Sequence, residues 1–158
     1  MSLNFLSYKD TILKTKRGNS HGVFSNAKPI YVMSIIDAIG EGVIVGNKIP
    51  FECEQLISIY KNNYKYVQDN GDVVYRANSN YTPYSLPYFH LNAESYYHIA
   101  WKEGVVPPKQ ASSPSSKYLR ENVKFAYLDE ALWNLLQSAE VRYDMKQAII
   151  QKFLITEQ

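Results

Sequence analysis

The longest apolar segment of the chain runs from Lys28 to Ile39, and its apolar side chains fall on nearly every side of a helical wheel. A helix that is apolar all round lies in the middle of a protein or in a bilayer. Ser34 and Asp37 interrupt the segment, and it is too short to span a membrane. Pro29 fits the first turn of a helix, and Gly40 would end it. The pattern therefore predicts a central core helix.

Five further segments show the spacing of apolar residues that is typical of helices. They cover residues 3–17, 52–67, 117–123, 130–136 and 139–154. Asp129 comes directly before the fourth segment and is its predicted N-cap. Because these segments and the central helix together occupy nearly half of the chain, the hydrophobic pattern indicates a helix-rich protein.

Two short β elements are predicted between the helices. Val43–Val45, with a turn at residues 46–47 and then Ile49, is typical of a short wing. Tyr88–Asn92 and Tyr96–Trp101 are aromatic-rich runs separated by three residues, and they predict an antiparallel β-hairpin. Residues 104–116 contain three prolines and four serines, which predicts an irregular surface loop.

Together these elements predict an α+β fold for residues 1–158, which we interpret as one helix-rich domain with a small antiparallel β-hairpin and a short wing. The hydrophobic fraction of 46% is ordinary for a folded protein, and this length can bury a core without disulfides. The single cysteine, Cys53, excludes an internal disulfide, and a buried core position is favoured over a reactive thiol. Neither a signal peptide nor a membrane-spanning run is visible, so we expect a cytoplasmic protein without membrane partners.

Charge is distributed unevenly along the chain. The formal net charge is only +2, but residues 1–28 carry five lysines or arginines against the single acid Asp10. Such a region is either a solvated face or a surface that binds phosphate, and the sequence leaves both open. Nine of the 14 tyrosines lie between Tyr60 and Tyr97. Tyrosine suits base stacking and interfaces, and it suits a half-buried sheet equally well.

Catalytic motifs are absent from the sequence. It contains no phosphate-loop pattern GxxxxGK[ST], no dinucleotide fingerprint GxGxxG and no HExxH metal motif. His90 and His98 would face each other if the predicted hairpin closes through three residues, and two imidazoles could begin the metal site of a nuclease. A third ligand is missing, so aromatic packing across the hairpin is favoured. We therefore expect a protein that is not an enzyme and that has no metal or cofactor.

Several segments follow one another in an order that resembles a known family. Arg17–Gly22 and Lys28–Ile30 are similar to its arginine–Ser-His-Gly loop and its Lys-Pro-aliphatic helix start. Pro87–Leu91, followed by Tyr96–Ile99, is similar to its proline–aromatic–aromatic–His-Leu hairpin. Phe125–Leu136 is similar to its Leu-Asp-acidic-x-Leu-Trp segment. The order of the segments carries the resemblance more than any one motif does.

The family is the sulfur-binding domain that precedes HNH nuclease domains in type IV, modification-dependent restriction endonucleases. The resemblance covers about residues 17–154, and it implies recognition of phosphorothioate DNA, in which sulfur replaces a non-bridging phosphate oxygen. In the family an apolar pocket around the hairpin proline holds the sulfur, and basic side chains hold the DNA backbone. A phosphate oxygen in such a pocket loses its hydration, whereas the softer sulfur loses less and gains dispersion.

Carried onto this chain, the resemblance implies that Pro87 forms the pocket wall, with Leu86 and Tyr88 beside it. Leu86 stands where the family usually has tyrosine. The residues that it implies at the DNA backbone are Arg17, His21 and Lys28, and after the hairpin Lys117 or Arg120. Ala27 replaces the usual histidine of the family beside its lysine, which removes one DNA contact.

The resemblance leads us to expect a non-catalytic module that binds modified double-stranded DNA in restriction or defence. No HNH nuclease follows the matched region before Gln158, so we expect a separate nuclease subunit to supply any cleavage. The alternative is a regulatory or interaction protein that retains the fold without specificity for DNA.

Overall fold

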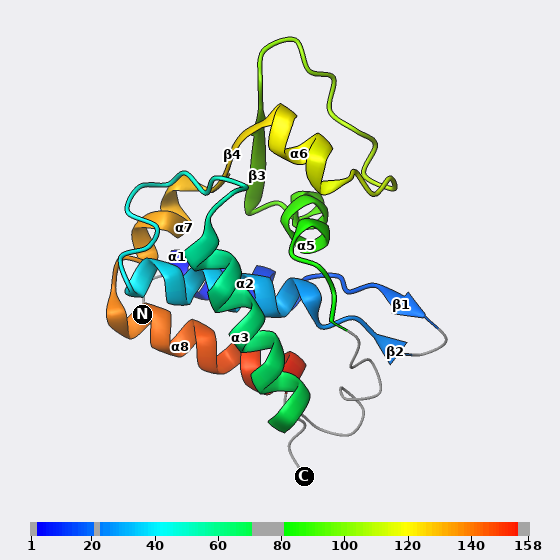
Figure 1. The fold of residues 1–158 in the computed structure, drawn as a ribbon. Helices are drawn as coiled ribbons and strands as arrows, with labels where there is room; N and C mark the ends of the chain where they lie inside the picture. The colour runs from blue at the N-terminus through cyan, green and yellow to red at the C-terminus, as the bar shows by residue number, and fades with distance from the viewer. Residues whose placement is uncertain (1–2, 21–22, 71–80, 155–158) are drawn as a thin grey trace.

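The computed structural model of the chain describes residues 3–20, 23–70 and 81–154, and it has the helix-rich α+β fold that the sequence predicts (Figure 1). The helices are α1 (Leu3–Leu13), α2 (Ala27–Gly40), α3 (Glu54–Asn70), α5 (Ser85–His90), α6 (Ser116–Asn122), α7 (Glu130–Leu135) and α8 (Ala139–Ile149). A 3₁₀ turn (Leu91–Ala93) follows α5, and a π-helical turn (Ile150–Leu154) continues α8. The strands are β1 (Asn19–Ser20), β2 (Val23–Phe24), β3 (Tyr97–Trp101) and β4 (Val123–Leu128).

Helix α2 is the centre of the molecule, as its apolar pattern predicts. In Figure 1 it crosses the middle of the fold, with α8 below it and α5 above, and α3 packs across it. Most of its side chains are buried, including Ile30, Tyr31 and Ala38, none of which is exposed at all. Burial on all sides is what a helix without a polar face requires.

The two polar residues inside α2 have partners from neighbouring helices. Ser34 Oγ donates to the carbonyl of Ile30 at 2.7 Å, and Asn63 Nδ2 of α3 donates to both Ser34 Oγ and Asp37 Oδ2. Lys146 Nζ of α8 forms an ion pair with Asp37 Oδ1 at 2.8 Å. Buried polar groups are tolerated when they are hydrogen-bonded in this way, so these residues tie three helices together.

Most of the described tyrosines between Tyr60 and Tyr97 form the core rather than a surface, whereas Tyr66 and Tyr81 are exposed. Tyr31 lies at its centre, and its ring contacts those of Tyr60, Tyr84, Tyr88 and Tyr97 at centroid distances of 5.5–6.5 Å. The hydroxyl of Tyr97 donates to the carbonyl of Tyr88 at 2.6 Å and lies 3.0 Å from the hydroxyl of Tyr31. Edge-to-face rings with bonded hydroxyls satisfy both the apolar and the polar part of tyrosine. These side chains therefore stack on one another and not on nucleic-acid bases.

The predicted hairpin of Tyr88–Asn92 with Tyr96–Trp101 is wrong. The first run lies in helix α5 and the turn after it, and β3 instead pairs antiparallel with β4, with Tyr97 opposite Leu128. A six-residue apolar run cannot be assigned to helix or strand by periodicity alone, because both can bury it. His90 ends a helix whereas His98 lies in a strand, so they do not face each other as the metal hypothesis requires.

The predicted wing at Val43–Val45 is also not a strand. Its chain bends after Gly42, which has a φ of 74°, and Val45 is 83% exposed. Only Ile49 keeps a β contact, as a single bridge to Ala126. A short antiparallel pair forms instead between β1 and β2, in the loop before α2. No helix within the described residues has the length and apolarity that crossing a membrane would require.

Candidate nucleic-acid interface

Lys28 is half-buried at the start of α2, and burial is the main cause that lowers the pKa of its ammonium group. The carboxylate of Glu94 opposes this effect, and the positive charge of Lys16 adds to it. Among the described residues, Lys28 has no hydrogen bond or ion pair within bonding distance. A partly desolvated cation beside a second cation is unfavourable until an anion joins them. An anion at this position would therefore relieve an unfavourable charge environment around Lys28.

His90 lies beside Lys28, at the last residue of α5. Burial lowers the pKa of its imidazole below the ordinary 6.5, and the positive charge of Lys28 lowers it further. Ser113 Oγ is 3.5 Å from His90 Nε2, and Gln110 Nε2 donates to the His90 carbonyl at 3.1 Å. Lys16 and His90 each interact electrostatically with Lys28, and the carboxylate of Glu94 lies near enough to Lys28 to oppose them. We call Lys16, Lys28 and His90 the cationic cluster.

Two members of the cationic cluster were missed by the prediction. Lys16 belongs to the basic first 28 residues, but its neighbour Arg17 was preferred because it matches the family loop. His90 was assigned to the hairpin and not to the DNA. If Leu86–His90 had been predicted as a helix, His90 would have been placed at the C-terminal end of that helix, where its side chain can lie near Lys28.

The apolar residues that were predicted to hold sulfur are more enclosed than expected. Pro87 lies in the first turn of α5, where its missing N–H costs nothing, and it is buried. Tyr88 is fully buried, and its hydroxyl donates to the carbonyl of Ile49 at 2.7 Å, so it belongs to the core. Leu86 alone of the three is half-exposed. Pro87 is one helical turn before His90, which still places this segment next to the cationic cluster.

Other predicted contacts are engaged within the protein. The guanidinium carbon of Arg17 lies 5.0 Å from the centre of the Phe153 ring, a cation–π contact that helps to hold the C-terminal turn. Arg120 Nε lies 3.4 Å from a carboxylate oxygen of Glu52, and Lys117 is 4.0 Å from Glu121. Arg17 thus has an aromatic partner, whereas Lys117 and Arg120 are exposed side chains in surface ion pairs and stay accessible to a ligand. His21 lies outside the described residues.

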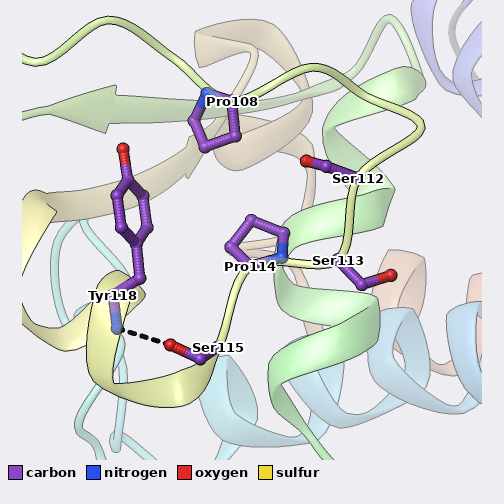
Figure 2. A pocket seen from close by; sticks show the side chains of 6 residues that line it. All are labelled: Pro108, Ser112, Ser113, Pro114, Ser115 and Tyr118. Carbon is purple, nitrogen blue, oxygen red and sulfur yellow. Dashed lines mark hydrogen bonds between the residues drawn. The ribbon is translucent and has the colours of Figure 1, made fainter.

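An apolar cavity of about 390 Å³ lies in the loop between β3 and α6, which also contacts His90. Figure 2 shows Pro108, Pro114 and the ring of Tyr118 around it, with three serines completing the lining. Ser112 donates its hydroxyl hydrogen to the carbonyl of Lys109 at 2.6 Å. Ser115 caps α6 by accepting from the Tyr118 N–H at 3.1 Å. These local bonds leave the cavity with few groups that could replace the hydration of an oxygen anion.

Within residues 3–20, 23–70 and 81–154, no three histidine, cysteine, aspartate or glutamate side chains come together as a metal ion would require. Comparison with known protein families finds no family that matches this chain. Comparison with curated proteins likewise finds no match.

Proposed function

We propose that this chain is a non-catalytic module of the cytoplasm that binds double-stranded DNA and recognises a phosphorothioate in its backbone. The observation that carries the proposal is the cationic cluster: Lys28 is half-buried, lacks a bonded partner among the described residues and lies beside Lys16 and His90. A phosphate group would add to the partial counter-charge of Glu94 and could accept hydrogen bonds from Lys28 and its neighbours. The resemblance to sulfur-binding domains supports the choice of DNA as the anion and restriction or defence as the setting.

Discrimination of sulfur requires an apolar surface beside this cluster. Leu86 and the buried Pro87 form one such surface, and the cavity between Pro108 and Pro114 forms another. An oxygen anion that enters either place gives up water and gains few hydrogen bonds, which costs several kcal/mol. Sulfur is larger, more polarisable and a weaker acceptor, so it loses less and gains dispersion. The selectivity would come mainly from rejecting the ordinary phosphate.

The test compares two duplexes of the same sequence, one with a single phosphorothioate and one without, by fluorescence anisotropy over a range of salt concentrations. We expect tighter binding of the phosphorothioate duplex. Lys28→Ala should weaken binding to both duplexes equally and reduce the salt slope by about one counterion. Lys65→Ala is the matched control, because Lys65 is exposed on α3 and already paired with Asp69 at 3.0 Å.

The binding of the two duplexes tests sulfur recognition and DNA recognition separately. Equal binding of both duplexes would contradict sulfur recognition, and no binding to either would contradict DNA recognition. If sulfur is preferred, Pro87→Ala and Pro114→Ala show which apolar surface holds it, because only the variant at the sulfur site should lose the preference.

A second candidate is an interaction or regulatory protein that retains the fold without DNA specificity. Two residues that were predicted to contact DNA make contacts within the protein instead, and this favours the second candidate. The hydroxyl of Tyr88 is bonded to the core, and Arg17 packs on Phe153. In this case the chain would bind a protein, such as a separate nuclease subunit, and the duplexes would show no affinity. Co-purification of a defined partner together with negative anisotropy would support this candidate.

A further inference from the structure

A second cavity, of about 570 Å³, lies on the other side of the β3–β4 pair from α5 and α6, where β4 leads into α7. Its lining combines aromatic and polar side chains from four parts of the chain. They are Asn47, His98, Tyr127, Leu128, Asp129, Glu130, Trp133 and Asn134. We call it the α7 cavity. A cavity of this size can hold a side chain or a small ligand.

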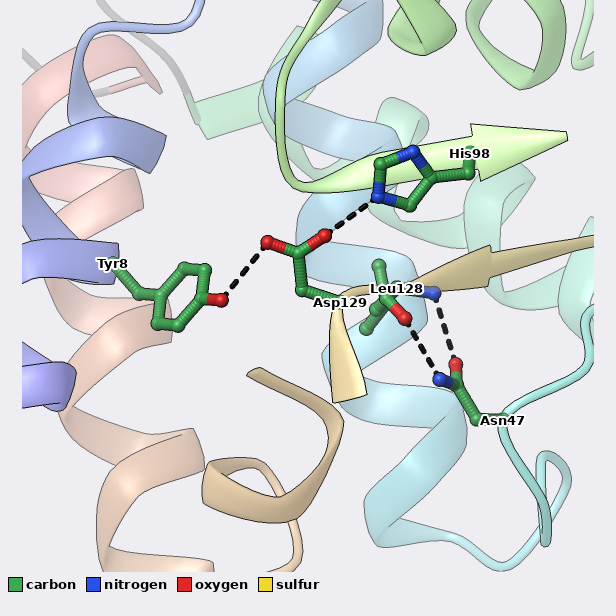
Figure 3. A network of polar contacts seen from close by, with 5 residues as sticks. All are labelled: Tyr8, Asn47, His98, Leu128 and Asp129. Atoms are coloured by element: carbon green, nitrogen blue, oxygen red, sulfur yellow. Dashed lines mark hydrogen bonds and ion pairs between the residues drawn. The ribbon is translucent and has the colours of Figure 1, made fainter. Parts of the chain in front are cut away.

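The base of the α7 cavity is held by a polar network, which Figure 3 shows. Asp129 Oδ1 lies 2.6 Å from His98 Nε2, and Asp129 Oδ2 accepts from the hydroxyl of Tyr8 at 2.9 Å. Asn47 bonds both the N–H and the carbonyl of Leu128, at 2.9 and 2.7 Å. Burial raises the pKa of Tyr8, and its bond to the Asp129 carboxylate raises it further, so Tyr8 stays a donor. The network holds the carboxylate of Asp129 and the imidazole of His98 in place, and none of these bonds comes from a lysine or arginine.

The charge and the ring faces of the α7 cavity select for a cation. Asp129 and Glu130 are two acids, and none of the described residues that line the cavity is a lysine or arginine. Even with His98 protonated, the lining keeps a net negative charge. The ring of Tyr127 lies against that of His98, with centroids 5.0 Å apart, and Trp133 is half-exposed. A planar cation can stack on such rings while it bonds to a carboxylate.

The α7 cavity is remote from the cationic cluster. Figure 1 shows α7 beside the end of α2 opposite to the end at which Ala27 begins, and Lys28 follows Ala27 directly. Its acids would repel a DNA backbone. A ligand at α7 therefore has the opposite charge from the ligand that the cationic cluster favours.

We propose that the α7 cavity binds the guanidinium group of an arginine side chain from a partner protein. Glu130 is exposed and can accept a paired hydrogen bond from the guanidinium, and Trp133 and Tyr127 line the cavity as aromatic side chains on which its plane could stack. Asp129 adds negative charge from below, since both of its oxygens are already bonded to neighbouring side chains. A lysine ammonium has no plane to stack and should bind less tightly. This inference does not depend on the proposed binding of DNA.

The probe is a tripeptide, acetyl-Gly-Arg-Gly-amide, with the citrulline peptide as its uncharged control of similar shape. Binding is followed through the indole N–H signal of Trp133 in NMR spectra, and Trp101→Phe identifies that signal because the chain has two tryptophans. We expect a saturable shift with the arginine peptide and little with the citrulline peptide. Glu130→Gln should weaken binding about fivefold or more. Glu121→Gln, on exposed α6, should leave it unchanged.

Four outcomes would overturn the inference. Equal shifts with the arginine and citrulline peptides would show that charge is not recognised. Equal shifts with a lysine peptide would show that the guanidinium plane is not recognised. A saturable shift of the Trp133 signal by duplex DNA, or no shift with any peptide, would exclude a basic protein segment as the ligand.

Discussion

At the scale of single residues, the structure distinguishes charges that the protein uses internally from charges that it leaves for a ligand. Arg17, Lys117 and Arg120 look as basic in the sequence as Lys28 does, but each has an aromatic or acidic partner. Lys28 has no bonded partner among the described residues, and only the nearby charge of Glu94 opposes its partial desolvation. The contacts of Arg17 with Phe153 and of Arg120 with Glu52 depend on residues that are distant in the sequence, whereas the Lys117–Glu121 pair is local.

His90 should make DNA binding depend on pH. The pKa of its imidazole lies below 6.5 in the folded protein. As pH falls, the unfolded chain therefore binds a proton at His90 before the folded protein does, and the free energy of unfolding decreases below about pH 6.5. A bound phosphate would raise this pKa, because it offsets the charge of Lys28. Affinity for a duplex should therefore be higher at about pH 5.5 than at about pH 7.5. Anisotropy measures this, and His90→Gln should remove most of the difference, whereas an unchanged dependence would exclude His90 from the interface.

Tyr97→Phe should destabilise the protein by about 1–3 kcal/mol. The substitution removes a buried hydroxyl that bonds the carbonyl of Tyr88 and contacts the hydroxyl of Tyr31, and both would be left without that partner away from water. Urea denaturation measures the free energy of unfolding. Tyr143→Phe is the control: Tyr143 is 69% exposed, so its change should stay within about 0.5 kcal/mol. Equal effects at the two positions would contradict a hydrogen-bonded tyrosine core.

At the scale of secondary-structure elements, the long helices were predictable, whereas the short helix α5 and the strand pairing were not. Residues 28–39, 52–67 and 139–154 carry long apolar patterns that match α2, α3 and α8 within a few residues. Strand β4 was missed, although Val123, Ala126 and Leu128 are buried and the strand had a visible alternation at its ends. Local spacing specifies a helix, because its hydrogen bonds are local, whereas a strand needs a partner from elsewhere in the chain.

Asp37 should be important for the packing of α2 against α3 and α8. Asp37→Ala removes the acceptor for both Asn63 and Lys146, and we expect a loss of about 1–2 kcal/mol, because these side chains are only partly buried. Asp10→Ala is the control, since its ion pair with Lys14 is exposed and should contribute less than about 0.5 kcal/mol. Thermal and urea unfolding measure both variants. An equally small loss for Asp37→Ala would show that the three-helix contact rests on apolar packing alone.

At the scale of the whole molecule, the fold separates two surfaces of opposite charge. The cationic cluster lies at the start of α2, and the acidic α7 cavity lies near its other end (Figure 1). Charges separated by more than about 10 Å are largely screened at 0.1 M salt. One surface can therefore bind an acidic ligand while the other binds a basic one.

Binding at the two surfaces should be independent. We expect the duplex affinity to change less than about twofold when the arginine tripeptide saturates the α7 cavity, because no charge is close enough to couple them. Anisotropy with and without the peptide measures the coupling. A large decrease in duplex affinity would mean that the two ligands compete for one site, which would contradict the separation of the surfaces.

The sequence alone determined the central helix, the other helical segments, the irregular loop of residues 104–116 and the helix-rich α+β class. Each of these depends on residues that are close together in the chain. Only the tertiary structure decided that Pro87 lies in the first turn of a helix, that β3 pairs with β4, and that Asp129 turns from its predicted cap toward Tyr8 and His98. It also brought Lys28 to His90 and buried the tyrosines, because a side chain acquires its partners, its charge environment and its exposure from segments that only folding brings near.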